Sequence, residues 1–246
     1  MRPKRAKLAG DIVVEFLPPR RASKRVVIIL DGLPTKPSKA KLINWFSKRG
    51  YWALHMRYRG TWESGGQFLD HEPSQDVFDL IDALPSGFTD VWSGELFKTH
   101  PEKVFVVGSS FGGCTALMCA LDDRVDRVVS LAPVTDWTAP TPGEPHDYLE
   151  QVVRDGYGGC YRFTHDDWWR LGRGELAQPI AHANQFDPQK LFIIHAEDDT
   201  VVPIGQTRAF LERVPARHRF LSRGDHLSAN HVMRWPLSRS ILNFFS

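Results

Sequence analysis

The chain has 246 residues, of which 42% are hydrophobic and 24% are charged, and its formal net charge is +2. This composition is ordinary for a globular protein, and the small charge gives no drive toward nucleic acid or acidic lipid. No apolar run approaches the roughly 18 residues that a membrane-spanning helix needs. We therefore expect a single domain over residues 1–246, with neither a nucleic-acid nor a membrane partner.

The N-terminal residues and the cysteines bear on location. The start MRPKRAKLAG is basic but lacks the apolar stretch of a signal peptide, and we interpret it as a solvated tail rather than a nucleic-acid-binding arm. Cys114, Cys119 and Cys160 are odd in number and lack the spacing of metal ligands. Free thiols in a reducing compartment are the expectation, which favours a cytoplasmic protein.

Apolar runs alternate with helical patterns along the chain. The first strand is expected near residues 11–17, at an edge of the sheet because two prolines end it. Further strands are predicted at residues 26–30, 51–58, 104–107, 127–132, 191–194 and 218–221. Helices are predicted after residue 110 and at residues 40–49, 73–84, 204–214 and 231–245. This alternation predicts an α/β fold with a mostly parallel, doubly wound sheet.

One segment, residues 136–189, breaks the alternation. It has no clear strand and is rich in proline, glycine and aromatic residues. Because a structureless loop of this length is implausible in a compact domain, we predict a small helical insertion, a lid or cap over the carboxyl ends of the strands. Trp137, Trp168 and Trp169 are candidates for lining a substrate pocket. The alternative is that they only fasten the insertion to the body.

A Gly-x-Ser-x-Gly motif lies between the strand at 104–107 and the following helix. Such a strand–turn–helix unit is typical of a nucleophile elbow, which holds its serine in a strained conformation at the carboxyl edge of a sheet. Gly108 and Gly112 supply the small neighbours that the turn requires. Ser110 is therefore the candidate nucleophile, and the N-terminus of the helix faces the reacting centre.

A serine hydroxyl needs a base to act as a nucleophile. In proteins with a nucleophile elbow, the acid and then the base follow the serine along the chain. The segment HAEDDTVVP after the strand at 191–194 offers Asp198 and Asp199 as the acid. The segment GDH after the last strand offers His226 as the base, with His231 as a rival. Loops at the carboxyl ends of neighbouring parallel strands meet, so these side chains are expected to converge.

The segments RYRGTWESGG, VFVVGSSFGG, HAEDDTVVP and GDH resemble the α/β-hydrolase superfamily. Within it, they resemble the catalytic domain of the prolyl oligopeptidase family and its single-domain esterase relatives, from about residue 26 to the C-terminus. The family pattern His-Gly-x-x-Asp-x-x-Val-Pro places its aspartate on Asp199. The resemblance thus implies a triad of Ser110, Asp199 and His226. It also implies an oxyanion hole from the backbone N–H groups of Phe111 and Leu33, with no metal or organic cofactor.

The resemblance implies acyl transfer through an acyl-enzyme. Our leading expectation is a serine esterase that acts on small or medium carboxylic esters. One alternative is a peptidase like prolyl oligopeptidase that acts on short peptides, although we expect the propeller domain of the large oligopeptidases to be absent. For such a peptidase, Glu144, Glu150 and Asp155 are candidates for binding a peptide amino terminus. Another alternative is a non-catalytic binding domain with a hydrolase fold, and the oligomeric state stays open.

Three residues near the motifs have roles that the motifs alone do not assign. Asp31 stands where relatives often have histidine, and it either forms a turn or alters the electrostatics of the pocket. Trp62, in the RGTWESGG segment, is a further candidate substrate contact. Arg59 in the same segment is expected to fasten this loop beneath the active-site floor.

Overall fold

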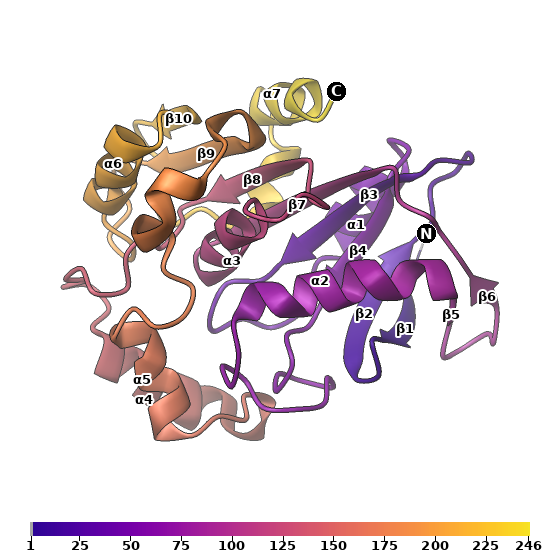
Figure 1. The fold of residues 1–246 in the computed structure, drawn as a ribbon, viewed down its shortest axis with the longest axis horizontal. Helices are drawn as coiled ribbons and strands as arrows, with labels where there is room; N and C mark the ends of the chain where they lie inside the picture. Colours follow the sequence, from indigo (N-terminus) through magenta and orange to yellow (C-terminus); the bar gives the residue numbers. More distant parts are fainter. Residues whose placement is uncertain (1) are drawn as a thin grey trace.

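The computed structural model describes residues 2–246 and shows an eight-stranded sheet flanked by helices (Figure 1). The strand order is β1-β2-β4-β3-β7-β8-β9-β10. These strands are β1 (Lys4–Leu8), β2 (Ile12–Leu17), β3 (Arg25–Leu30), β4 (Trp52–Met56), β7 (Lys103–Ser109), β8 (Arg127–Leu131), β9 (Leu191–Ala196) and β10 (Arg217–Leu221). From β4 to β10 all neighbours are parallel, whereas β2 pairs antiparallel with both β1 and β4. The predicted mostly parallel sheet is confirmed.

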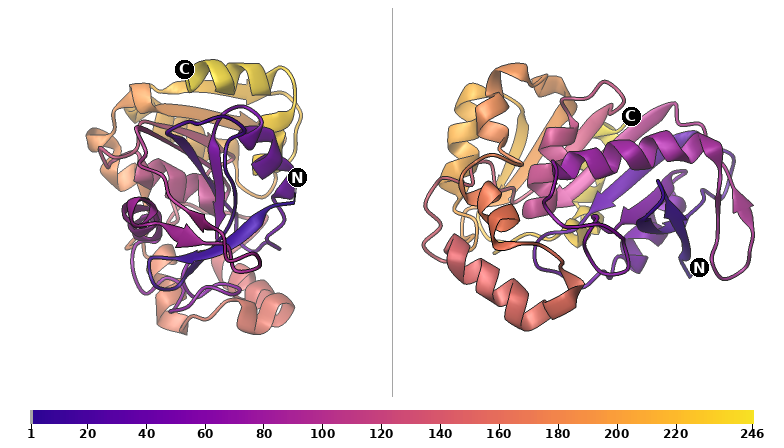
Figure 2. Two further views of the ribbon diagram at one scale, coloured as in Figure 1. Left: turned by 90° about the vertical axis from the view of Figure 1, so that its right-hand side faces the viewer. Right: turned by 60° about the horizontal axis from the view of Figure 1, so that its bottom comes forward.

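Two apolar cores form on the two faces of the sheet, because side chains alternate along each strand. In β7, Val104 and Val106 belong to one core and Phe105 and Val107 to the other. The first core is covered by α2 (Pro73–Ala83), α3 (Phe111–Cys119) and α6 (Ile204–Arg213), and the second by α1 (Ala40–Ser47) and α7 (Leu237–Phe244). Figure 2 shows helices on both sides of the sheet. The sheet is therefore doubly wound, as the sequence predicts.

Residues 136–189 connect β8 to β9 and are helical. They contain α4 (His146–Tyr157), α5 (His165–Gly172) and 3-10 turns at Gly158–Cys160, Pro179–Gln185 and Pro188–Lys190. The structure describes all of these residues, and none lies in a strand. In Figure 1, α4 and α5 lie at the lower left, apart from the helices that cover the sheet. A two-stranded hairpin, β5 (Phe88–Thr89) with β6 (Leu96–Phe97), follows α2 and the 3-10 turn Leu84–Ser86.

The N-terminal residues form a strand, so the predicted solvated tail is wrong. Because β1 pairs with β2 on its outer side, β1 and not β2 is the edge strand. Ala6 and Leu8 are buried, whereas Lys4 and Arg5 form ion pairs with acidic side chains of other segments. The sequence pattern did not predict this strand, because basic residues interrupt its short apolar alternation. The acidic partners of these basic residues lie elsewhere in the chain and cannot be identified from the local sequence.

The closing helix is shorter than predicted at residues 231–245. A 3-10 turn at Ala229–Met233 precedes Pro236, and α7 begins only at Leu237. Proline lacks a backbone N–H and favours the first position of a helix over its interior. The apolar spacing of this segment predicted one continuous helix, but Pro236 separates it into a 3-10 turn and α7.

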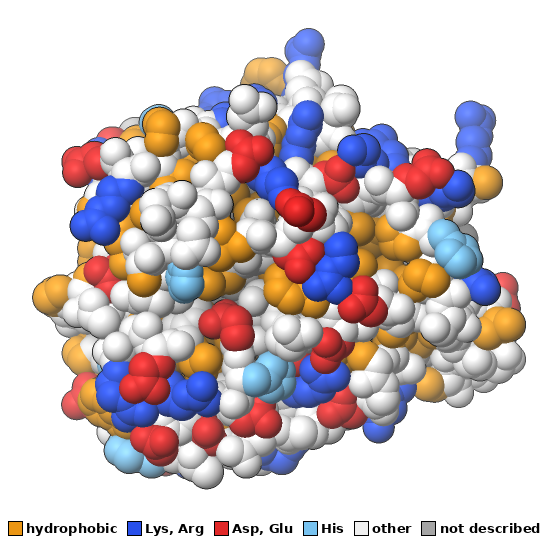
Figure 3. Space-filling view, in the orientation of Figure 1, with side chains coloured by type: hydrophobic (Ala, Val, Ile, Leu, Met, Phe, Trp, Pro, Cys, Tyr) orange, Lys and Arg blue, Asp and Glu red, His pale blue; other side chains and the backbone are white. Residues whose placement is uncertain are grey.

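The surface has no large region of a single charge on the face shown in Figure 3, where acidic and basic side chains are interspersed. None of the helices within residues 2–246 combines the length and the apolar character that crossing a bilayer requires.

The turn from β7 into α3 brings three backbone segments into close contact. A Cβ atom on Gly108 would lie 1.9 Å from the carbonyl oxygen of Gly112. A Cβ atom on Gly112 would lie 2.5 Å from the carbonyl oxygen of Asp31, at the end of β3. These neighbours are backbone atoms, which cannot move aside as a flexible side chain does. Both positions therefore require glycine.

A cluster of charges holds the loop after β4. The guanidinium of Arg59 donates to the carboxylates of Asp76 and Asp79 at 2.7 Å. His71 lies 2.9 Å from Asp76 through Nε2 and pairs with Asp70 through Nδ1. The hydrogen bond to Asp76, opposed by burial and reinforced by Asp70, raises the pKa of His71 to about 9.

The first prediction concerns Gly108→Ala. Because the new methyl group meets backbone, the substitution is expected to destabilise the protein by about 3 kcal/mol or more. The matched control is Gly156→Ala in α4, where a Cβ atom would meet nothing within 4 Å. The control is expected to stabilise the helix by about 0.5–1 kcal/mol. Urea unfolding measures both, and equal effects of the two substitutions would contradict the prediction.

The second prediction concerns pH. The pKa of His71 is raised from 6.5 to about 9 in the folded protein, so its contribution to stability is complete below about pH 6.5 and is lost as the pH rises through about 9. Urea unfolding of the wild type and of His71→Gln is expected to differ at about pH 5.5 and to converge at about pH 10.5. A stability difference of the same size at both pH values would show that the pairing of His71 is not the cause.

Candidate active site

Ser110 lies at the carboxyl edge of the sheet, at the point where the strand order reverses. Strands β3 and β7 are neighbours, and the connection from β3 leads to β4 on one side whereas the connection from β7 leads to β8 on the other. Ligands of open α/β sheets bind in the crevice at such a switch point. Ser110 directly follows β7, and Leu33 lies in the loop that follows β3. Both residues therefore border this crevice.

The backbone of Ser110 is strained, with φ 55° and ψ −124°. A non-glycine residue in so sparsely populated a region costs about 1–3 kcal/mol, which the surrounding structure must offset. The Ser110 N–H donates to the carbonyl of Leu131 at 2.9 Å, and the Ser110 carbonyl accepts from the N–H of Cys114 at 2.9 Å. Hydrogen bonds to β8 and within α3 thus hold the strained residue from both sides.

Asp199 and His226 form a hydrogen-bonded pair. Nδ1 of His226 lies 2.8 Å from Oδ2 of Asp199, although 27 positions separate the two residues. The same carboxylate receives Nε2 of His195 at 3.2 Å and the backbone N–H groups of Val201 and Val202 at 2.9 and 3.0 Å. Burial acts to raise the pKa of Asp199, but these donors outweigh it and lower that pKa below its usual range. Asp199 is therefore ionised at neutral pH and orients the imidazole.

The rival acid and base lie in other environments. Oδ1 of Asp198 accepts the backbone N–H groups of Gly224 and Asp225, each at 2.8 Å, so this carboxylate braces the loop that carries His226. His231 lies in a 3-10 turn, where its Nδ1 is 3.0 Å from the carbonyl of Ser228. The structure thus brings Asp199, and not Asp198, to His226.

The hydroxyl of Ser110 makes no hydrogen bond to His226 or to any other group among residues 2–246. Because Nδ1 of His226 is engaged by Asp199, Nε2 is the nitrogen available to a second partner. The contact between nucleophile and base is often long in a resting site and tightens when substrate binds.

Two backbone N–H groups border Ser110 without a partner. Phe111 is the first residue of α3, and Leu33 lies in the loop after β3. Within the part of the chain that the structure describes, no hydrogen bond engages either N–H. The loop after β3 lies against the nucleophile, since a Cβ atom on Gly32 would be 3.2 Å from the Cβ of Ser110. The two donors are thus available to an anion that forms at the serine.

Asp31 anchors the loop that carries Leu33. Its buried carboxylate forms an ion pair with Lys39 and lies 2.6 Å from Nε2 of His55. Burial acts to raise the pKa of Asp31, but His55 and Lys39 lower it overall. Asp31 thereby ties the end of β3 to the start of α1 and to β4.

A narrow cavity of about 30 Å³ opens beside Ser110. Body and insertion both contribute to its walls: Leu33, Val134 and Val201 come from the loops after β3, β8 and β9, and Trp137, Glu144 and Leu149 from residues 136–189. A second cavity, of about 10 Å³, lies on the other side of Leu33 and is lined by Trp62, Phe111 and Asp31. Of the candidate tryptophans, Trp137 therefore borders the cavity of Ser110 and Trp62 its neighbour.

The other two tryptophans hold the insertion together. Trp168 is fully buried, and its Nε1–H donates to the carbonyl of His146 at 3.1 Å. The ring of Trp169 packs against His146 and His165. Neither lines the cavity beside Ser110. Leu149 and Val201 do line it, yet nothing in their local sequence distinguished them from other apolar residues.

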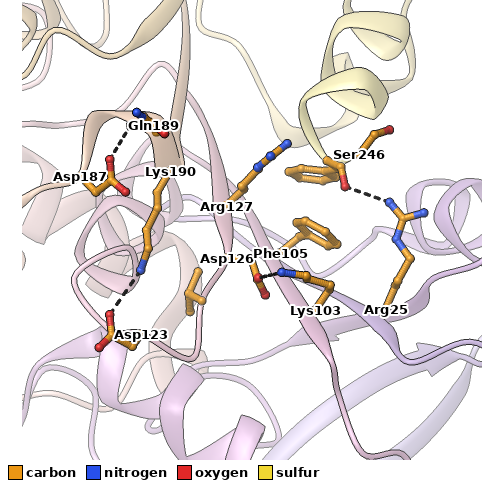
Figure 4. A pocket seen from close by; sticks show the side chains of 12 residues that line it. Arg25, Lys103, Phe105, Asp123, Asp126, Arg127, Asp187, Gln189, Lys190 and Ser246 are labelled. Carbon is orange, nitrogen blue, oxygen red and sulfur yellow. Dashed lines mark hydrogen bonds and ion pairs between the residues drawn. The ribbon is translucent and has the colours of Figure 1, made fainter.

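A larger cavity, of about 590 Å³, lies at the opposite edge of the sheet (Figure 4). Its walls come from the amino-terminal ends of the strands, including Arg25, Lys103 and Arg127, and from the C-terminal residues. Charges in it pair with one another, as Lys103 does with Asp126 at 2.6 Å. This cavity is remote from Ser110, and the switch-point argument favours the smaller one. Across residues 2–246, no group of three or more histidine, cysteine or acidic side chains is arranged to hold a metal ion.

Comparison with known proteins supplies independent information. A sequence model of the prolyl oligopeptidase family matches residues 37–236. An acylaminoacyl peptidase of Pyrococcus horikoshii has a TM-score of 0.66 and 16% identity, over 99% of this chain and 41% of that chain. A puromycin-hydrolyzing peptidase of Mycobacterium tuberculosis has a TM-score of 0.70 and 18% identity, over 99% and 39%. An esterase of Pyrococcus furiosus has a TM-score of 0.68 and 17% identity, over 99% and 89%. A search of curated protein sequences found no match.

The structural likenesses are too distant in sequence to show more than a shared fold. The chain spans about two fifths of the length of the two peptidases and most of the esterase. The family match is more informative, because it covers most of the chain and includes Ser110, Asp199 and His226. The chain belongs to the prolyl oligopeptidase family.

Proposed function

We propose that the protein is a serine hydrolase that cleaves carboxylic esters through an acyl-enzyme. Ser110 is the nucleophile, His226 the base and Asp199 the acid that orients it. The observation that carries the proposal is the partly buried Asp199–His226 hydrogen bond, at the same edge of the sheet as the strained Ser110. Family membership supports a hydrolase of this kind.

In this mechanism, Nε2 of His226 takes the proton of Ser110 as the hydroxyl attacks the ester carbonyl. Asp199 keeps the proton on Nδ1 and stabilises the imidazolium that forms. The free N–H groups of Phe111 and Leu33 stabilise the tetrahedral oxyanion, each contributing roughly 3 kcal/mol in the transition state. The intermediate collapses to the acyl-enzyme as His226 gives its proton to the departing alcohol. His226 then takes a proton from the attacking water and returns it to the Ser110 oxygen as the carboxylic acid leaves.

The cavity supports a preference for short acyl groups. Its volume of about 30 Å³ leaves room for only a few heavy atoms. Residues 136–189 supply one wall through Trp137, Glu144 and Leu149, so we propose that this insertion acts as a lid over the acyl group. No metal or organic cofactor enters the proposed steps. The free thiols of Cys114, Cys119 and Cys160 agree with a cytoplasmic location, which we also propose.

A peptidase that cleaves short peptides is the second candidate. The matching family is named for an oligopeptidase, and two of the similar structures are peptidases. Amides are cleaved by the same triad, so the difference lies in substrate recognition. If the purified protein cleaves aminoacyl anilides at a far higher kcat/KM than p-nitrophenyl esters of short acids, the peptidase is the correct assignment.

The third prediction tests the nucleophile. A fluorophosphonate probe is expected to label the wild type at Ser110, and Ser110→Ala is expected to lose both the label and all measurable ester turnover. Thermal unfolding is expected to show that Ser110→Ala is folded. The strained residue is held by hydrogen bonds of its backbone, which alanine also makes. A folded wild type that takes no label and hydrolyses no ester would instead favour a non-catalytic binding domain.

The fourth prediction distinguishes the two neighbouring aspartates. Asp199→Asn is expected to lower kcat for a p-nitrophenyl ester about ten-thousand-fold, because the amide no longer favours the productive tautomer of His226. The matched control Asp198→Asn keeps an oxygen that accepts the N–H groups of Gly224 and Asp225, so its loss is expected to stay below about tenfold. A larger loss in Asp198→Asn than in Asp199→Asn would reassign the acid.

A further inference from the structure

Glu144 presents a carboxylate to the cavity of Ser110. It lies between β8 and α4, is half-buried and lines the same cavity as the nucleophile. Among residues 2–246, no hydrogen bond or ion pair engages its carboxylate. Burial raises the pKa of Glu144, while His226 lowers it and Asp199 raises it, so the carboxylate is within electrostatic reach of both partners of the triad.

The backbone holds this carboxylate in place. The Glu144 N–H donates to the carbonyl of Thr141 at 3.0 Å, and the Thr141 hydroxyl donates to the Glu144 carbonyl at 2.9 Å. A Cβ atom on Gly143 would lie 2.2 Å from the carbonyl oxygen of Thr200, the residue after Asp199. The turn at residues 141–144 is thus packed directly on the loop that carries the catalytic acid.

The other ionisable side chains of the lining, Asp136 and His146, are already engaged. Oδ1 of Asp136 accepts from Thr138 N–H at 2.9 Å and from Gln178 Nε2 at 2.7 Å. Nε2 of His146 is 3.1 Å from the carbonyl of Trp168. Most of the remaining lining is apolar. Glu144 is therefore the charged group of this lining whose partner is missing within the described residues.

A partly desolvated carboxylate without a partner gains free energy when a cation enters its pocket. We propose that Glu144 binds a positively charged group of the substrate close to the scissile carbonyl, as the ammonium of an aminoacyl ester would present. The proposal rests on the serine hydrolase function proposed above and narrows its substrate class. The cation can belong to the acyl group or to the alcohol, and the same carboxylate recognises either.

The fifth prediction uses two pairs of esters that differ chiefly in one charge. L-alanine methyl ester is compared with methyl propionate, and propionylcholine with 3,3-dimethylbutyl propionate. Hydrolysis is followed by acid release at about pH 6.5, where an α-ammonium is mostly charged. Glu144→Gln is expected to lower kcat/KM about tenfold for the cationic member of at least one pair and to change the neutral members less than about twofold. A response of the first pair places the cation on the acyl side, and a response of the second on the alcohol side.

The matched control is Asp147→Asn, which removes a charge from an exposed residue three positions along the same segment and outside the cavity. It is expected to change none of the four rates by more than about twofold. Equal losses of Glu144→Gln on cationic and neutral esters would overturn the proposal, because Glu144 would then act through His226 and not on the substrate. A wild type that favours the neutral member of both pairs would overturn it as well. If the wild type hydrolyses none of the esters and takes no fluorophosphonate label, the proposed function itself fails and this inference fails with it.

Discussion

The active site depends on a contact between bare backbones. The turn after β7 forms only because Gly108 and Gly112 leave no side chain between the start of α3 and the end of β3. This close approach holds Ser110 in its strained conformation and places the first N–H of α3 beside it. The loop after β3 lies against Ser110, and Leu33 in that loop lines the same cavity. One steric constraint thus positions Ser110, the start of α3 and the loop after β3.

The buried contacts of Asp31 stabilise the loop between β3 and α1. Asp31 follows β3 at the point where Gly112 packs, and its carboxylate pairs with Lys39 and lies 2.6 Å from Nε2 of His55. A buried carboxylate is stable only with such partners, and removal of either would leave an uncompensated charge. The network therefore resists displacement of the loop that carries Leu33. The contacts of Asp31 with Lys39 and His55 thus join the end of β3 to α1 and β4.

The insertion at residues 136–189 and the body of the protein together line the narrow cavity beside Ser110. Trp168 and the rings around it give the insertion its own packing, so that Trp137, Glu144 and Leu149 are presented to Ser110 from a stable element. Gly143 joins this element to the acid loop through backbone contact. The proposed selection of substrates, by acyl size and by charge, therefore resides in the insertion, while the proposed chemistry resides in the sheet.

Sequence alone determined what short-range physics controls. The apolar runs predicted the parallel strands, and the glycine spacing around Ser110 predicted the elbow, because strand burial and turn sterics act over a few residues. Local patterns failed in two places. Basic residues obscured the apolar alternation of residues 4–8, which form an edge strand by pairing with β2. The apolar spacing of residues 231–245 predicted one helix, although Pro236 divides the segment. The residue types alone left Asp198 and Asp199 equivalent, and only the family resemblance favoured Asp199. The tertiary structure brings Asp199, and not Asp198, to His226, and it gives Glu144 its place beside Ser110. Adjacent acidic residues look alike in sequence, and only the packing of segments far apart in the chain gives each carboxylate a different set of donors.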